Sequence, residues 1–357
     1  MRRFYAALAL VATLFSGTAS ADLLFIESFD HLTTSTITRK WSSGLNTSIG
    51  TGGQNGTNAW RSTNYDNRRL GVTLSPSTTT GVVGFALNLV STPPTLASIF
   101  NVQDTAGARQ LSLSMNSAGT FTIRRGGYNG TVLTTASTSL SISTYNYIEW
   151  KFHIDNAGST SLRINGVEVA TYTGDTQNTA NNNWGPVQLG PNSEDFGSGF
   201  YADDLYVLDS NGSTNNNFLG PIRIKAIYAD GAGNSTDFTP SAGSNFQNVD
   251  EATVDDDTTY NSETTTGDHD TYTFGAVGLT GTVLGVQVNL HARSAGVGGE
   301  LIRPTIRIGS TDYNGTSRAV TTSYSNYRQL FQVSPATSTA WTIAEIDGAE
   351  FGVELVP

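Results

Sequence analysis

The chain has 357 residues, of which 37% are hydrophobic and 14% charged, a formal net charge of −11, and no cysteine. Its length predicts two or three domains, and a charged share below the usual ~25% means that Ser, Thr, Asn and Gly keep the chain in solution. The missing cysteines exclude disulfides, thiolate catalysis and cysteine-type zinc sites. The acidic balance excludes nucleic acid as an expected partner, because such binding needs a cationic stripe.

The first 21 residues have the composition of a secretion signal. Two arginines follow the first methionine, residues 4–15 carry no charge, and residues 19–21 have the small-x-small form of a cleavage site. We predict a signal peptide over 1–21, cleavage before Asp22, and a protein that is extracellular or part of a virion. The apolar run is too short to span a bilayer comfortably, so no membrane partner is expected after cleavage. A buried N-terminal anchor or a mis-assigned start codon would explain the same residues.

Alternation of apolar and polar residues recurs from residue 23 onward and is typical of strands with one buried face. Asn165-Gly166 is a strong hairpin signal, because a type I′ turn needs positive φ at both central positions. No window of eleven or more residues has a convincing helical period, so we predict an all-β chain. The alternating segments are 23–29, 81–89, 111–115, 120–125, 147–154, 161–172 and 200–208, and then 221–229, 271–274, 282–294, 302–313, 327–333 and 351–356.

The alternation stops over residues 209–220, which are rich in Ser, Asn, Gly and Thr. We therefore place a domain boundary there. It separates a first β domain over 22–218 from a second, smaller β-sandwich over 219–357.

Two adjacent aspartates, Asp203 and Asp204, interrupt the last strand of the first domain, FYADDLYVL. Consecutive residues of a regular strand point to opposite faces, so the pair cannot chelate one ion from regular geometry. At least one of them lies near a strand end, or a β-bulge intervenes. Two interpretations stay open: a strand entrance with solvated acids, and a calcium site shared with a neighbouring loop.

Six segments have a combined pattern that is found elsewhere: 23–41, 147–155, 161–190 and 200–220, followed by 220–274 and 341–355. Together they resemble structural proteins of tailed bacteriophages that carry a laminin-G-like, concanavalin A-like jelly roll. The resemblance implies a jelly roll over 22–218 in which Leu23–Phe29 lies beside Phe200–Leu208. It also implies a non-catalytic virion protein, associated with tail or capsid, whose partners are other virion proteins or further copies of itself and whose jelly roll contacts cell-surface glycan.

Residues 345–350 match the E-x-D-x-x-E pattern of laminarinase-like retaining glycoside hydrolases through Glu345, Asp347 and Glu350. Such enzymes need two carboxyl groups ~5–5.5 Å apart, which a bulged strand can present on one face. The pattern lies at the C-terminal end, and Gly348 and Ala349 replace the large apolar residues expected between the acids. A glycoside hydrolase that uses these three residues is therefore an alternative to the non-catalytic function.

The stretch from Asp250 to Asp270 is rich in carboxylates and contains no Lys or Arg. Hard cations bind such oxygen clusters, although the spacing does not fit an EF-hand. A solvated acidic loop is the alternative. We predict that no cofactor is required and name Asp255, Asp257 and Asp204 as candidate calcium ligands.

Four aromatic residues stand in polar surroundings and are candidate carbohydrate contacts: Trp60, Tyr65, Tyr128 and Trp184. Sugars stack on flat rings while neighbouring polar groups bind their hydroxyls. The alternative is that Trp60 and Trp184 close the ends of the core. If these rings are surface contacts, the chain is a secreted carbohydrate-binding module, the second alternative function.

Overall fold

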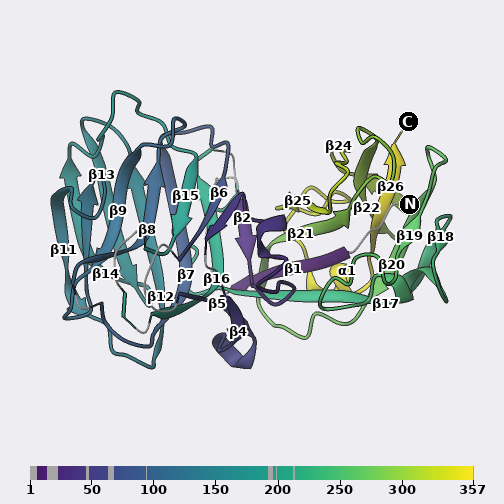
Figure 1. Cartoon of the computed structure of the whole chain (residues 1–357), viewed down its shortest axis with the longest axis horizontal. Helices are drawn as coiled ribbons and strands as arrows, with labels where there is room; N and C mark the ends of the chain where they lie inside the picture. The colour runs from purple at the N-terminus through teal and green to yellow at the C-terminus, as the bar shows by residue number, and fades with distance from the viewer. Residues whose placement is uncertain are drawn as a thin grey trace. The chain divides into compact units, whose positions relative to one another are not determined.

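The computed structural model describes residues 6–13, 23–45, 48–62, 68–93, 95–191, 196–197, 199–211 and 214–356 (Figure 1). Strands hold 51% of the chain and helices 5%, which confirms the all-β fold class. Within the described residues, no helix has the length and apolar character needed to cross a membrane. The chain separates into two compact units. We call residues 23–29 and 33–222 the jelly-roll unit, and residues 6–13, 30–32 and 223–356 the C-terminal unit.

The jelly-roll unit contains two antiparallel sheets. The seven-stranded sheet has the order β11 (Thr131–Ser139), β10 (Thr120–Arg125), β9 (Arg109–Met115), β8 (Ala97–Gln103), β15 (Pro186–Leu189), β6 (Arg69–Thr73) and β3 (Ser43–Leu45). The eight-stranded sheet has the order β14 (Val167–Gly174), β13 (Gly158–Ile164), β12 (Tyr145–His153), β7 (Thr80–Leu89), β16 (Phe200–Asp209), β5 (Asn58–Ser62) and β4 (Ser48–Thr51), with β2 (Leu23–Glu27) on β16.

The core of this unit lies between the two sheets. Phe100 of β8 packs against Phe85 of β7 and Trp150 of β12, with ring centroids 5.9 and 6.4 Å apart. Each of these side chains is buried. Strand β2 pairs with β16, as the resemblance implied for the first and last strands of the jelly roll. Two short 3-10 helices, η1 (Ile37–Arg39) and η2 (Gln54–Gly56), lie in its connections.

The expected hairpin at Asn165-Gly166 is confirmed, with φ of +51° and +80° between β13 and β14. Of the two geometries left open at Asp203-Asp204, a strand end or a bulge, the structure has the bulge. The register between β16 and β7 shifts between Asp203 and Tyr206, and Asp204 has φ +48°.

Both aspartates of the bulge are buried. The interpretation that they are solvated acids at a strand entrance is therefore wrong. The Asp203 carboxylate accepts the backbone N–H of Gln54 at 2.8 Å and that of Asp204 at 2.8 Å. Asp203 therefore fastens the η2 loop to β16.

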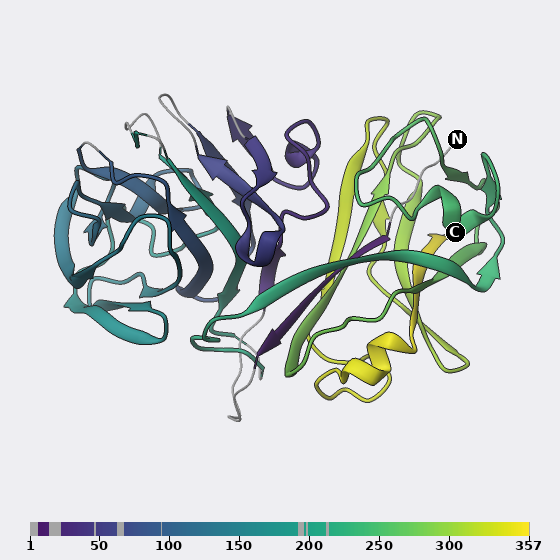
Figure 2. The same cartoon turned by 90° about the horizontal axis from the view of Figure 1, so that it is seen from below.

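The C-terminal unit is a second β-sandwich (Figure 2). Phe274 and Phe351 meet edge to face in its core, 5.4 Å apart. Its main sheet has the order β23 (Thr311–Asn314), β22 (Leu301–Ile308), β26 (Glu350–Val356), β20 (His269–Phe274), β17 (Arg223–Thr236), β1 (Ala6–Thr13), β21 (Thr282–Ala292) and β25 (Ser325–Phe331), with β24 (Arg318–Ala319) on β22. The remaining elements are β18 (Thr239–Pro240), η3 (Asn245–Asn248), β19 (Asn261–Ser262) and α1 (Ile343–Asp347).

Candidate functional site

A continuous row of polar and small residues crosses the outer face of the seven-stranded sheet. Its members face one another across successive strand pairs, and the opposite face of the same strands carries the core residues Leu111 and Leu113. Six strands at ~4.8 Å spacing make the row about 24 Å long. We call it the polar row. In order across the sheet it consists of Arg124, Ser112, Asn101, Gln188, Gly71 and Ser43.

Three side chains of the polar row hold buried polar atoms without a hydrogen-bond partner among the described residues. These atoms are Asn101 Nδ2, Gln188 Oε1 and Arg124 Nε. A buried donor or acceptor left unpaired costs ~1–3 kcal/mol, so each favours a ligand or water that supplies the missing bond. Asn101 is fully buried. Arg124 and Gln188, on either side of it in the row, are half-buried, so a ligand can reach these two side chains from solvent.

The hydroxyl of Ser112 links the buried centre of the row. It donates to Asn101 Oδ1 at 2.8 Å, and it lies 3.4 Å from the hydroxyls of Ser98 and Ser114 on the same face. Asn101 Oδ1 is occupied in this way, whereas its Nδ2 group has no acceptor among the described residues. The centre of the row therefore offers an amide donor, and Gln188 beside it offers an amide acceptor.

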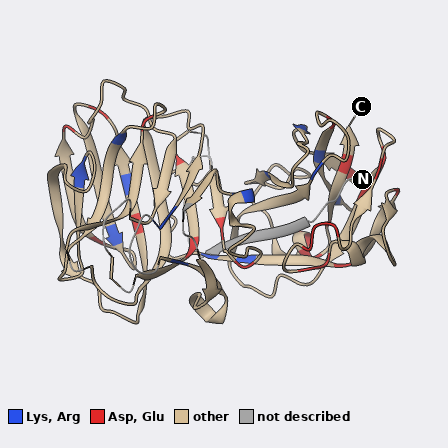
Figure 3. Cartoon of the chain, in the orientation of Figure 1, with Lys and Arg blue, Asp and Glu red and all other residues tan. Residues whose placement is uncertain are grey.

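The seven-stranded sheet is also the cationic part of an acidic chain. Its seven strands contain Arg69, Arg109, Arg124 and Arg125 and no Asp or Glu, although the chain as a whole has 30 acidic residues. Figure 3 shows basic residues on strands of the jelly-roll unit. Arg124 belongs to the row, and Arg69 stands two residues before Gly71 on the same face. Burial lowers the pKa of Arg124.

A loop over residues 175–183 borders the row beside β9. Gln110 Oε1 accepts the backbone N–H groups of Asn178 and Thr179 at 2.8 and 3.2 Å. The Asp104 carboxylate accepts from the Thr179 hydroxyl at 2.9 Å and from Asn181 Nδ2 at 3.1 Å. Burial acts to raise the pKa of Asp104, but bonds from the Ala108 backbone N–H and from Asn181 and Thr179 lower it overall, so this carboxylate keeps its charge as an anchor of the loop.

The two tryptophans expected as carbohydrate contacts are core residues. Trp60 is 0% and Trp184 1% exposed. Trp60 packs edge-on against Phe200 at 5.6 Å, and Trp184 packs against Phe152 at 5.2 Å while its Nε1 donates to the Thr78 carbonyl. A ring enclosed on both faces cannot stack on a sugar, so the alternative, closure of the core, is what the structure shows.

The other two aromatic candidates have different outcomes. Tyr128 is half-buried in the turn between β10 and β11, four residues after Arg124, and stays a prediction. Tyr65 lies outside the described residues.

We expect Trp184→Ala to destabilise the jelly-roll unit by ~3–5 kcal/mol, because it leaves a cavity and removes the bond to Thr78. Trp184→Phe keeps a ring in place and should cost clearly less. Urea unfolding followed by circular dichroism measures both values. Unchanged stability of the alanine variant together with lost glycan retention would restore Trp184 as a surface contact.

The carboxylates of the E-x-D-x-x-E pattern do not share one strand face. Glu345 and Asp347 belong to the short helix α1, and Glu350 begins β26. Glu345 accepts from the Ser334 hydroxyl, and Asp347 accepts the backbone N–H of Val277 at 2.8 Å. The bulged strand that a retaining hydrolase requires is therefore not formed by this pattern.

Glu350 serves a structural role of its own. Its Oε2 accepts the Thr271 hydroxyl at 2.6 Å and the backbone N–H of Asn234 at 2.7 Å. These bonds join β26 to β20 and β17. All three carboxylates of the pattern thus bind different segments of the C-terminal unit.

The candidate calcium ligands of the acidic stretch bind protein groups. Asp255 accepts the Thr259 hydroxyl at 2.8 Å, and Asp257 accepts from Arg293 at 2.9 Å. Asp204, the third candidate, belongs to the jelly-roll unit. Within the part of the chain that the structure describes, no three His, Asp or Glu side chains are grouped so that they could hold a metal ion.

The last residue of the stretch, Asp270, is fully buried. It accepts bonds from Phe238 N, Asn245 Nδ2 and the Tyr272 hydroxyl at 2.7–2.9 Å. Burial raises the pKa of Asp270. This carboxylate joins η3 to β20 and is a structural group.

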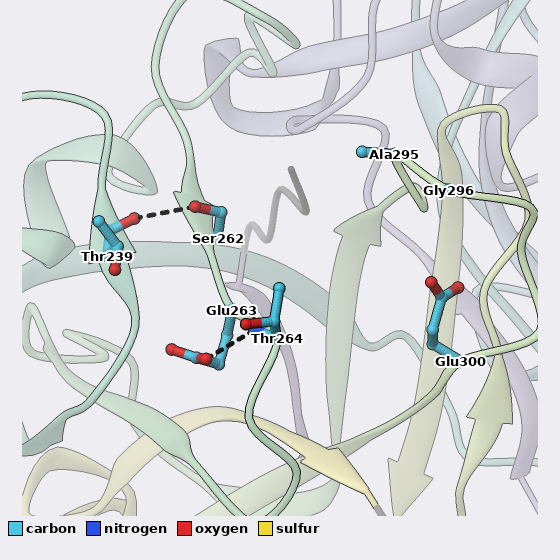
Figure 4. Close-up of a pocket in the computed structure, with 7 residues that line it drawn as sticks. All are labelled: Thr239, Ser262, Glu263, Thr264, Ala295, Gly296 and Glu300. Carbon is cyan, nitrogen blue, oxygen red and sulfur yellow. Dashed lines mark hydrogen bonds between the residues drawn. The ribbon is translucent and has the colours of Figure 1, made fainter.

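A pocket of about 520 Å³ opens in the C-terminal unit (Figure 4). Thr239, Ser262, Glu263 and Thr264 line one side, and Ala295, Gly296 and Glu300 line the other. Glu263 accepts two backbone N–H groups of its own loop, and Glu300 accepts the Ser294 hydroxyl at 3.1 Å. The two carboxylates thus stabilise the loops that carry them, and none of the seven lining residues named here is basic.

A second polar cluster lies on the outer face of the eight-stranded sheet, beneath residues 217–220. Glu149 Oε1 accepts the Tyr206 hydroxyl at 2.7 Å and the backbone N–H of Gly220 at 2.8 Å. The Arg163 guanidinium stacks on the Phe218 ring at 4.1 Å. Burial raises the pKa of the Glu149 carboxyl. The chain after β16 therefore covers this face.

The raised pKa of Glu149 predicts a pH dependence of stability. Since the folded pKa exceeds the ordinary value of 4.5, the folded state holds its proton more tightly. This contribution is fully present below 4.5 and is lost as the pH rises through the folded pKa. We expect the melting temperature of the jelly-roll unit to fall over that range, and to fall less in Glu149→Gln. Matching pH profiles for both proteins would contradict this role of Glu149.

No protein-family profile matches the sequence, and no curated protein matches it. Solved structures do match. A glucuronan lyase from the fungus Trichoderma reesei is 14% identical, with a TM-score of 0.41 over 54% of this chain and 96% of its own. An alginate lyase is 14% identical, with a TM-score of 0.38 over 55% and 97%. Domain 4 of an extracellular arabinanase from Geobacillus stearothermophilus, solved with arabinotriose, is 16% identical, with a TM-score of 0.37 over 54% and 94%.

These structures correct two expectations. They are polysaccharide lyases and a domain of an arabinanase, so the expectation of a non-catalytic virion protein is contradicted. The expectation that the chain is not an enzyme is contradicted in the same way. The likeness itself concerns the β-sandwich fold.

Proposed function

We propose that this chain is a carbohydrate-active protein that holds an anionic polysaccharide along the polar row. The observation that carries the proposal is the set of unpartnered buried atoms on Asn101, Gln188 and Arg124, aligned across three adjacent strand pairs. An amide donor, an amide acceptor and a guanidinium match the hydroxyl and carboxylate groups of a uronic acid polymer. The row is long enough for several sugar rings.

The charge of the sheet supports an acidic rather than a neutral polymer. The seven strands carry arginines and no carboxylate, so a polyanion meets no repulsion from them, whereas the chain as a whole has a charge of −11. Glucuronan and alginate, the polymers named for two of the similar structures, belong to this chemical class. They are therefore the first polymers to test.

The row supports β-elimination better than hydrolysis. Glycoside hydrolysis generally needs two carboxyl groups, and the strands of this sheet provide none. In β-elimination a base takes the proton from C5 of a uronate, the C4–O bond breaks with its electron pair going to the leaving oxygen, which takes up a proton, and a C4–C5 double bond forms. The polar row would supply the charge stabilisation for this step and not the base. Arg124 and Asn101 would pair with the uronate carboxylate and stabilise the negative charge that develops on it.

Affinity electrophoresis in gels with alginate, glucuronan or a neutral β-glucan tests the binding. We expect both acidic polymers to retard the protein and the neutral glucan to leave its migration unchanged, with weaker retardation at higher ionic strength. Ultraviolet absorbance of unsaturated uronate ends tests the reaction. Equal retardation by the neutral glucan would contradict an anionic ligand, and reducing ends without unsaturation would indicate hydrolysis.

A further inference from the structure

One layer of the C-terminal unit is completed by strand β1, near the start of the chain. β1 pairs antiparallel with β17 from Ala7 to Ala12 and with β21 from Ala6 to Thr13 (Figures 1 and 2). In the order of this layer, β1 stands between β17 and β21, and β25 follows β21 on the far side. Every described backbone pairing that joins β17 to β21 therefore passes through β1.

The residues of β1 fall inside the segment whose composition predicts a cleaved secretion signal. Removal of residues 1–21 would leave both neighbouring strands in place, about 9.5 Å apart, with facing rows of unpaired N–H and C=O groups. The two strands cannot easily close this gap. β21 is paired to β25 over 286–292, and β17 is paired to β20 from Ala229 onward.

The strands on either side of the gap also contribute to the core. Val286, Val288 and Leu290 of β21 are at most 1% exposed, and Ile224 of β17 is 2% exposed. An empty place between them would open this core to water. A strand at that position would keep this core covered.

We propose that the mature chain accepts there an extended strand from another protein chain, a form of β-strand addition. The inference depends on the predicted cleavage before Asp22 and is independent of the polysaccharide proposal. The strand now in place defines the partner: eight uncharged residues, Ala, Leu and Val with one Thr at the end, antiparallel to both neighbours. Backbone hydrogen bonds to two strands would provide much of the affinity, and the apolar side chains would complete the layer.

The test begins with the full chain, produced with its leader in an exporting bacterium and weighed intact. Mature protein starting at Asp22 is then mixed with a peptide of residues 6–13 that carries two added lysines. We expect amide hydrogen exchange over 223–228 and 283–290 to slow by at least about tenfold, with no comparable change in the jelly-roll unit. The same peptide with Leu10→Pro is the matched control, since proline cannot complete a central strand.

Three results would overturn the proposal. Exported protein that keeps residues 1–21 would show that β1 is a permanent strand of the chain. Mature protein already protected over 223–228 and 283–290 without peptide would show that the layer closes by itself. Equal protection by the Leu10→Pro peptide would show that binding does not use the place of β1.

Discussion

Arg124→Gln is expected to weaken binding of alginate about ten- to hundredfold at low ionic strength. Arg124 supplies the positive charge of the polar row, and a hydrogen bond to a charged group is worth ~1.5–3 kcal/mol. Arg124→Lys keeps the charge but loses the planar set of donors, so an intermediate affinity is expected. Isothermal titration calorimetry with alginate oligosaccharides measures the affinity of the wild type, Arg124→Gln and Arg124→Lys.

The control for this series is Arg307→Gln. Arg307 is a half-buried arginine of the C-terminal unit that pairs with Asp312 at 2.8 Å. Arg307→Gln changes the net charge of the protein by the same amount as Arg124→Gln, but at a residue that is not part of the polar row. The wild-type affinity should fall with added salt more steeply than that of Arg124→Gln. Equal loss of affinity in both glutamine variants would indicate a non-specific charge effect and contradict the polar row as the site.

The fold of Arg124→Gln has to be checked, because Arg124 Nη1 also donates to the Gly130 carbonyl at 2.9 Å. Loss of that bond in the turn after β10 should cost about 1 kcal/mol. A urea midpoint near the wild-type value would show that weaker binding comes from the lost ligand contact. If the urea midpoint of Arg124→Gln falls far below the wild-type value, its weaker binding could come from unfolding. Arg124→Lys, which keeps the positive charge, is then the variant whose affinity tests the site.

Lys40→Met is expected to destabilise the jelly-roll unit by ~3–5 kcal/mol. Lys40 Nζ lies 3.1 Å from Glu27 Oε2, and both side chains are fully buried. Glu27 also accepts the Phe29 backbone N–H at 2.8 Å and Trp41 Nε1 at 3.3 Å. Removal of the cation leaves a buried carboxylate without its counter-charge. With total stabilities of ~5–15 kcal/mol, this is a large fraction.

The matched experiment is a double-mutant cycle with Glu27→Gln. Glutamine carries no charge and keeps one acceptor oxygen, which can serve either Phe29 or Trp41, so the double variant should recover part of the loss seen in Lys40→Met. Urea unfolding free energies of the four proteins give the coupling. Additive losses would mean that the ion pair contributes no coupling energy to the unit.

The strands were predictable from the sequence because their pattern is local. Alternation in segments such as 147–154 and 200–208 indicated β12 and β16, and Asn165-Gly166 placed a hairpin at the correct residues. At Asp203 the pleat left a strand end or a bulge open, since adjacent residues of a regular strand point to opposite faces, and only the structure decided for the bulge.

The polar row could not be predicted, because its members belong to strands scattered between residues 43 and 188. Only the register of the sheet aligns Arg124 with Ser112 and Asn101. The available signal was the set of serines in the alternating segment 111–115, whose polar positions define one face of β9. Without the neighbouring strands, that face is indistinguishable from an ordinary solvated one.

The tryptophans were misjudged for the opposite reason. Trp60 and Trp184 have polar neighbours in the sequence, which suggested surface loops. In the fold their contacts come from distant residues, Phe200 for Trp60 and Phe152 for Trp184. Large rings gain more from burial than their polar sequence neighbours can offset, so local polarity was a poor guide to their exposure.

The most direct test of the central claim is a titration with alginate oligosaccharides followed by the side-chain amide NMR signals of Asn101 and Gln188. If the polar row holds the polymer, both signals should shift with the same saturation curve, and Arg124→Gln should weaken both together. A neutral glucan should leave them unchanged. If alginate binds while both amide signals keep their positions, the polymer lies elsewhere and the proposed site is wrong.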